Sequence, residues 1–302
     1  MNKVDGAAVM DQIYFLVELL LGVFIAGSIY SLIAMGLSLL WSTVGLANFA
    51  HGAILVVGSY IAWYFSSLTG VPLLMFLTVP IMFLIGALFD KSIFRQVRYK
   101  EDSGLRLILI TITLALVIEQ ILNIIFGGIR RRIPTLLPGE INLGNAIIIS
   151  NQYILVFIVA SVTLIVLYFI LTRTITGIAI RAIGQNMQES LLVGINVERI
   201  YTTTVGIGFA LAGIAGALLG SIYIFNASFG RMPLLIGYII VVLGGVGNLK
   251  GTIYASYLIA TIEAFTTFYI GGSWRIAIPF LVMILILLIR PYGLFGTKEA
   301  TR

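Results

Sequence analysis

The chain has 302 residues, of which 60% are hydrophobic and only 10% are charged. Soluble globular domains are about half apolar and about a quarter charged, so this composition excludes a soluble domain. The net charge of +6 does not indicate a nucleic-acid partner, because the basic residues lie between apolar segments and not along one soluble face. The absence of cysteine excludes disulfides, thiolate catalysis and thiolate metal sites.

Apolar runs of membrane-spanning length follow one another along the chain. A helix needs roughly 20 apolar residues to cross about 30 Å of hydrocarbon, whereas a barrel strand is an alternating segment of about ten residues. The continuous runs therefore predict an all-α, polytopic transmembrane helix bundle of about eight or nine segments, in one domain over residues 1–302. The predicted segments are 13–41, 46–69, 72–90, 105–127, 153–172, 203–225, 233–247, 252–271 and 276–290.

The first segment follows a polar start with two aspartates, so it is predicted to be a membrane helix and not a cleaved signal peptide. The second contains the sequence Asn48-Phe49-Ala50-His51-Gly52, with the only histidine of the chain. One histidine cannot form a typical metal site or catalytic triad, so we predict neither. Asn48 and His51 are expected either to pack at a break between helices or to lie in a translocation path, and Gly52 is a candidate hinge or packing position.

Basic residues in short loops predict the orientation. Segment 91–106 is the densest basic stretch and is placed in the cytoplasm, with segment 173–201 on the same side. The three arginines at 130–132 would then lie outside, so either the helix count fails locally or they have another task, such as meeting an acidic partner. Asp90 and Arg290, at predicted helix ends, are expected to be solvated anchors.

Two carboxylates lie within predicted membrane segments, where ionisable groups are costly and are therefore functional candidates. Glu119 is late in segment 105–127, and Asn123 lies one helical turn further on the same side. Glu263 lies inside segment 252–271. Each carboxylate is predicted either to contact substrate or to make interhelical hydrogen bonds near the interface.

The polar stretch 173–201 has apolar residues at helical spacing, and Gly194 ends the pattern. This pattern predicts a short cytoplasmic helix that either docks into a groove on another protein or lies on the bilayer surface. The apolar stripe is Ile180, Ile183, Met187 and Leu191, and the residues off the stripe are Arg181, Gln185, Gln188 and Glu189.

A glycine-rich run, Gly244-Gly245-Val246-Gly247-Asn248-Leu249-Lys250-Gly251, lies at the end of the short segment 233–247. A Walker A loop needs Ser or Thr directly after its lysine, and here glycine follows, so a phosphate-binding loop is excluded. These glycines are predicted to release the backbone from helical geometry or to allow close helix packing. Without a nucleotide site of its own, the chain cannot drive transport by ATP alone.

The sequence resembles one family in four separated stretches. These are Gly45–Gly52, Arg181–Asn196, Val242–Asn248 and Arg290–Gly296, in order over about residues 15 to 296. The family is that of the branched-chain amino-acid ABC importer permeases, in particular its LivH-type subunit. The run at 242–249 is also similar to the urea and short-amide permeases of the same superfamily.

The resemblance implies a prokaryotic plasma-membrane permease that pairs with a second, related permease. It also implies two cytoplasmic ATP-binding subunits and an extracytoplasmic substrate-binding protein. ATP and Mg²⁺ would be bound by the partner subunits, and no cofactor by this chain. Residues 181–196 correspond to the family's coupling loop, with Glu189 and Gly194 carried over, and Glu263 falls where related permeases have a glutamate.

We therefore predict a non-enzymatic transport subunit for branched-chain or other amino acids, working by alternating access. A urea or short-amide importer permease is the alternative within the superfamily. A stand-alone secondary transporter or channel, with Glu119 and Glu263 carrying protons or lining the path, is the alternative from another class.

Overall fold

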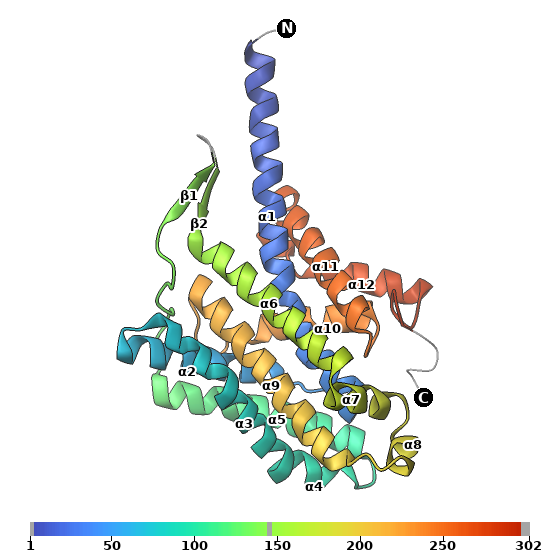
Figure 1. The fold of residues 1–302 in the computed structure, drawn as a ribbon. Coiled ribbons are helices and arrows are strands. Elements are labelled where there is room, and N and C mark those ends of the chain that lie inside the picture. Colours follow the sequence, from blue (N-terminus) through green and yellow to red (C-terminus); the bar gives the residue numbers. More distant parts are fainter. Residues whose placement is uncertain (1–2, 144–146, 297–302) are drawn as a thin grey trace.

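The computed structural model describes residues 3–143 and 147–296 and shows a helical bundle with one small β-hairpin (Figure 1). The hairpin pairs β1 (Glu140–Leu143) with β2 (Ile147–Ser150) in antiparallel register, Glu140 opposite Ser150. The α-helices are α1 (Lys3–Leu39), α2 (His51–Thr69), α3 (Thr78–Phe89), α4 (Arg95–Arg98), α5 (Ser103–Phe126), α6 (Asn151–Arg173), α7 (Ile175–Gln185), α8 (Met187–Leu192), α9 (Val197–Ile222), α10 (Arg231–Gly244), α11 (Leu249–Tyr269) and α12 (Ala277–Ile289). Short π or 3₁₀ segments are η1 (Leu40–Val44), η2 (Pro72–Leu77), η3 (Asp90–Phe94) and η4 (Gly272–Trp274).

Helix α9 forms the centre of the bundle, with 89% of its most apolar window buried. Its glycines and alanines allow neighbouring backbones to approach closely, as is usual where helices pack inside membranes. A Cβ on Gly213 would lie 2.6 Å from the Met82 side chain of α3, and one on Gly216 would lie 2.0 Å from the carbonyl of Leu55 in α2. The small residues of α9 therefore set how tightly α2 and α3 pack.

The chain leaves α1 through a π-helical turn, η1, and Gly45 then takes a left-handed conformation with φ +69°. Residues 45–50 form an irregular connection before α2 begins at His51. The predicted segment 46–69 is thus helical only from residue 51, because the glycine ends the preceding helix. A second irregular stretch, between α9 and α10, lies against this break, since Gly52 contacts Gly230.

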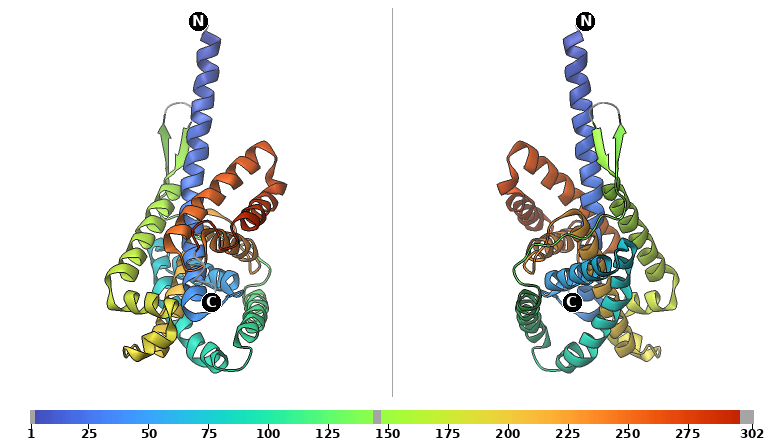
Figure 2. Two further views of the ribbon diagram at one scale, coloured as in Figure 1. Left: turned by 90° about the vertical axis from the view of Figure 1, so that its right-hand side faces the viewer. Right: turned by 90° about the vertical axis from the view of Figure 1, so that its left-hand side faces the viewer.

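The two basic segments lie at the same end of the bundle, as predicted. Arg95 of α4 forms an ion pair of 3.0 Å with Glu198 of α9, and α4 and α8 both lie at the lower end in Figure 1. The loop after α5 lies at the other end, where Arg131 and Phe225 exchange backbone hydrogen bonds of 2.8 Å. Because α5 is one unbroken helix of 24 residues, the arginines at 130–132 are on the opposite side from segment 91–106. Figure 2 shows the hairpin and the start of α1 extending from one end.

Six of the described helical segments are long and apolar enough to cross a membrane. Their length and composition are those of a multi-pass membrane protein. Helices α10 and α12 are apolar but shorter, with 14 and 13 residues. At about 1.5 Å per residue α10 extends roughly 21 Å, less than the thickness of about 30 Å of the hydrocarbon layer. The count of eight or nine crossings stays a prediction.

The mostly helical fold agrees with the predicted helix bundle, and the β-hairpin is an addition that the sequence did not predict. One expectation from the sequence is wrong. Asp90 is not a solvated anchor: its side chain is fully buried, is ion-paired with Arg98, and accepts a hydrogen bond of 2.6 Å from Thr202 on α9. Arg290, in contrast, is exposed at the end of α12.

Candidate functional site

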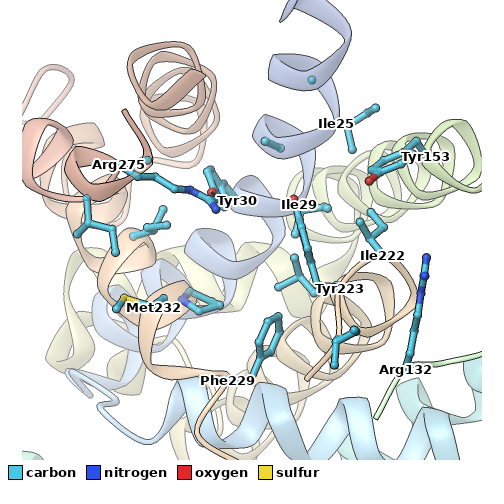
Figure 3. A pocket seen from close by; sticks show the side chains of 18 of the residues that line it. Ile25, Ile29, Tyr30, Arg132, Tyr153, Ile222, Tyr223, Phe229, Met232 and Arg275 are labelled. Atoms are coloured by element: carbon cyan, nitrogen blue, oxygen red, sulfur yellow. Dashed lines mark hydrogen bonds between the residues drawn. The ribbon is translucent and has the colours of Figure 1, made fainter. Parts of the chain in front are cut away.

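A cavity of about 890 Å³ lies between α1, α6, α9, α10 and the segment before α12, at the end of the bundle away from the basic segments (Figure 3). This volume is within the range of about 300–1,000 Å³ that is usual for small-molecule sites. Most of the wall is apolar, and the polar side chains on it are few. The apolar wall includes Ile25, Ile29, Ile222, Phe229, Met232 and Pro233, and the polar wall Tyr30, Arg132, Tyr153, Tyr223, Ser228 and Arg275.

Three side chains form a polar cluster at the edge of this cavity. Arg275, which precedes α12, is ion-paired through Nε with Glu263 of α11. The Tyr30 hydroxyl of α1 donates a hydrogen bond of 2.6 Å to the same carboxylate and accepts one of 3.3 Å from Arg275 Nη2. Glu263 is only 6% exposed, so its charge is compensated inside the protein. Figure 3 shows Arg275 directed toward Tyr30.

A smaller hollow of about 50 Å³ lies where α2, α5 and α10 begin to diverge. Glu119 of α5 is bound there in a bidentate manner by Arg231, the first residue of α10, at 2.7 and 3.1 Å. Asn123 lies one turn along α5 and is partly exposed. Ser228 lines both hollows, so the segment that leads into α10 separates them.

Asn48 and His51 lie inside the bundle and line neither hollow. Both are fully buried. Asn48 Oδ1 accepts a hydrogen bond of 3.0 Å from the Ala50 amide, whereas its Nδ2 has no hydrogen-bond partner among the described residues. The His51 ring lies beside the backbone of Ile33 on α1. The imidazole packs against Gly36 of α1, where a Cβ would lie 2.8 Å from its Cε1. The structure therefore places both side chains in the packed break between α1 and α2.

The predicted single amphipathic helix at 173–201 is wrong in detail. Asn186 is extended and divides it into α7 and α8, because its Oδ1 caps α8 by accepting from the amides of Gln188 and Glu189 at 3.0 and 3.2 Å. Ile180 and Ile183 are buried in the chain's own core, at 2% and 4% exposure, so this half of the stripe has no free face.

The predicted coupling residues lie around this capped turn at the end of the bundle that carries the basic segments. Arg181, Gln185 and Glu189 are exposed, and Gly194 follows α8 with φ +81°. Glu189 Oε1 accepts a hydrogen bond of 2.8 Å from Asn186 Nδ2, so this carboxylate orients the side chain that caps α8. The exposed apolar surface here is Leu191, Leu192 and Val193, at 51%, 87% and 76% exposure, of which the sequence analysis named only Leu191.

A charged network anchors this end. Arg98 is ion-paired with buried Asp90, lies 3.6 Å from Glu198, and stacks 4.3 Å from the ring centre of Tyr201. Tyr99 donates a hydrogen bond to Glu198. Partial burial and the neighbouring carboxylate raise the pKa of the Tyr99 hydroxyl to about 12, so it remains a donor at neutral pH.

The predicted hinge or packing glycines lie at close backbone contacts. A Cβ on Gly52 would be 2.3 Å from the Gly230 carbonyl, and one on Gly251 would be 2.2 Å from that of Gly244. Gly245 and Gly247 have φ of +91° and +81°, a region that favours glycine. At each end of helix α10, the backbones of two glycines are thus in close contact.

The family described as "Branched-chain amino acid transport system / permease component" matches residues 19–287 of this chain. The chain belongs to this family. Its members are permease subunits of ABC transporters, which are not themselves enzymes, and the resemblance seen in the sequence is confirmed. No solved structure matches the chain.

Among the similar proteins is the high-affinity branched-chain amino acid transport system permease protein BraD of Pseudomonas aeruginosa. It is 31% identical over 97% of this chain and 100% of its own length. Two relatives come from Methanocaldococcus jannaschii. The protein named as a branched-chain permease LivH is 26% identical over 91% of each chain, and that named LivM is 27% identical over 72% of this permease and 65% of its own length.

Sequence reasoning missed Arg275 and the tyrosines around it, although it singled out Glu263. The available signal was an arginine between two apolar segments at the end predicted to be extracytoplasmic, where the positive-inside tendency makes arginine less expected. The pairing itself joins residues 30, 263 and 275, so only the fold brings it together.

Proposed function

We propose that this permease carries branched-chain amino acids across the prokaryotic plasma membrane as one subunit of an importer driven by separate ATP-binding subunits. The observation that carries the proposal is the cavity of about 890 Å³. Its wall is apolar over most of its area and carries a charged cluster at one edge. A zwitterion with an aliphatic side chain needs both kinds of surface, whereas urea has no apolar part to bury.

The cavity lies at the end opposite the basic segments, which the positive-inside tendency assigns to the cytoplasm. It therefore faces the side on which an extracytoplasmic binding protein would deliver substrate. The start of α10 separates the cavity from the small hollow at Glu119 and Arg231. We propose that alternating access moves this segment, so that substrate passes from the larger hollow toward the break before α2.

The exposed apolar surface Leu191–Val193 is the proposed contact with an ATP-binding subunit. Apolar side chains exposed together at a cytoplasmic end mark an interaction site. The adjacent segment α7 packs on η1 and α9, so a displacement of α8 would reach the central helix. Glu189 holds the Asn186 side chain that caps α8, so its charge reversal would also weaken this cap.

A second, related permease is the proposed partner within the membrane. Gln120 and Asn123 of α5 and the Arg231 side chain, which is 67% exposed, form a polar face on this chain. Charged and polar groups at membrane depth are costly against lipid and normally face protein or water. We propose that the second permease covers this face. The alternative of a proton-coupled transporter is less supported, because Glu119 and Glu263 are both bound to arginines.

The test of coupling is Leu192→Asp in the complete complex, reconstituted in liposomes with the second permease, the ATP-binding subunits and the binding protein. We expect leucine uptake and binding-protein-stimulated ATP hydrolysis to be lost. Ile175→Asp is the matched control, because Ile175 is equally exposed at 87% but lies outside α8. Unchanged stimulation in Leu192→Asp, or equal losses in both variants, would contradict the assignment of α8.

A further inference from the structure

The Arg275 guanidinium has more hydrogen-bond donors than the protein uses. An arginine carries five N–H donors in a planar fork. Nε donates to Glu263, Nη2 donates to the Tyr30 hydroxyl, and Tyr223 also interacts with the group. The Arg275 side chain is 46% exposed and lines the cavity. The remaining donors are therefore available to a molecule in the cavity.

The charged side chains on the mostly apolar wall of the cavity are cationic. Arg275 and Arg132 both line it, and no aspartate or glutamate is among the described residues of the wall. Figure 3 shows the two arginines on opposite sides of the hollow. Glu263 is buried behind Arg275 and is not part of the wall. A cleft lined by one sign of charge raises the local concentration of the opposite sign, and an arginine fork suits a carboxylate in particular.

We infer that Arg275 binds the α-carboxylate of the transported molecule, with Glu263 and Tyr30 as positioning residues that hold the guanidinium at the edge of the cavity. This inference rests on the proposed function and narrows its substrate class. A free carboxylate is required, and neutral urea or an amide lacks the group that Arg275 recognises. The isoleucines and Phe229 of the wall accept the aliphatic side chain, and the hydroxyls of Tyr153, Tyr223 and Ser228 offer acceptors to the ammonium group.

The test measures modification of Arg275 by phenylglyoxal in the assembled complex, followed by mass spectrometry. L-leucine at about ten times its dissociation constant is expected to slow modification of Arg275 roughly 10-fold, because only about one Arg275 in ten would then be free of substrate. Leucinamide and urea are expected to leave the rate unchanged. Arg290, which is exposed after α12 outside the cavity, is the internal control and should react equally under all conditions.

The outcomes separate the inference from the proposed function. Equal rates with L-leucine and leucinamide, in a complex that transports leucine, would overturn the inference and leave the proposed function standing. Protection of Arg275 by acetate, in a complex that transports no amino acid, would overturn the proposed function and leave Arg275 standing as a carboxylate site.

A double variant, Glu263→Met with Arg275→Met, tests whether the pair is only structural. Removing both charges avoids a buried carboxylate without a partner, so the complex should assemble. We expect its leucine uptake to fall roughly 10- to 100-fold because the carboxylate has lost its contact. Uptake equal to that of the unmodified complex would overturn the inference.

Discussion

Asp90→Leu is the substitution from which we expect the largest loss of stability at the cytoplasmic end. Asp90 is fully buried, and the Arg98 side chain paired with it is only 7% exposed. Removal of the carboxylate leaves Glu198, at 3.6 Å, as the carboxylate nearest to Arg98, and leaves the Thr202 hydroxyl only the Glu198 backbone carbonyl, at 3.1 Å, as acceptor. Breaking a buried ion pair on one side costs about 3–5 kcal/mol, because the remaining charge stays largely desolvated after losing its nearest partner.

The measurement is thermal unfolding of the purified permease in detergent. At roughly 2 °C per kcal/mol for a chain of this size, the melting temperature should fall by at least about 6 °C. Arg95→Met is the matched control, because its ion pair with Glu198 is half exposed, at 53% for the Arg95 side chain. Such surface pairs contribute about 0–1 kcal/mol, so the control should shift by no more than about 2 °C.

The double variant Asp90→Leu with Arg98→Met decides whether the cause is the unpaired charge. Removing both partners leaves no buried ion, so at least half of the lost stability should return. A drop in the double variant as large as in Asp90→Leu alone would refute the reasoning, since it would place the cost in packing and not in the ion pair.

Three further outcomes are expected. Gly52→Ala should prevent assembly or unfold the break before α2, because its Cβ would lie 2.3 Å from the Gly230 carbonyl. The control Gly104→Ala, whose Cβ would have nothing within 4 Å, should be neutral or stabilising in the same thermal assay. Asn186→Ala should cost about 0.5–2 kcal/mol locally and speed amide hydrogen exchange over residues 187–192, with unchanged exchange counting against the cap. Trp63→Ala should lower the melting temperature by a few degrees, because it removes the ring on which the Arg131 guanidinium stacks at 4.3 Å from the ring centre. An unaltered unfolding curve would contradict this.

The apolar runs predicted where helices form because membrane burial is a local property of about 20 consecutive residues. The same reasoning failed where a single residue ends a helix. The irregular residues 45–50 fall inside the predicted segment 46–69, and Asn186 divides the polar stretch 173–201, one break following a left-handed turn at Gly45 and the other made by a side-chain cap. The β-hairpin was missed because its strands have only four residues each.

The candidate site was predictable only in part. Glu119 and Glu263 were found because carboxylates are rare in membrane segments, but their partners Arg231 and Arg275 are 112 and 12 residues away. The burial of Asp90 could not be inferred, since a charged residue at a helix end is usually solvated and only the packing of α9 makes it an interior group. The apolar face of 173–201 was predicted correctly only at Leu191, because Ile180 and Ile183 of α7 are buried in the chain's own core.

Uptake of radiolabelled L-leucine by the complete reconstituted complex tests the central claim most directly. The account predicts accumulation that requires ATP on the cytoplasmic side, requires the binding protein, and is not competed by excess urea. Accumulation by this chain alone under a pH or sodium gradient, without ATP-binding subunits, would contradict it.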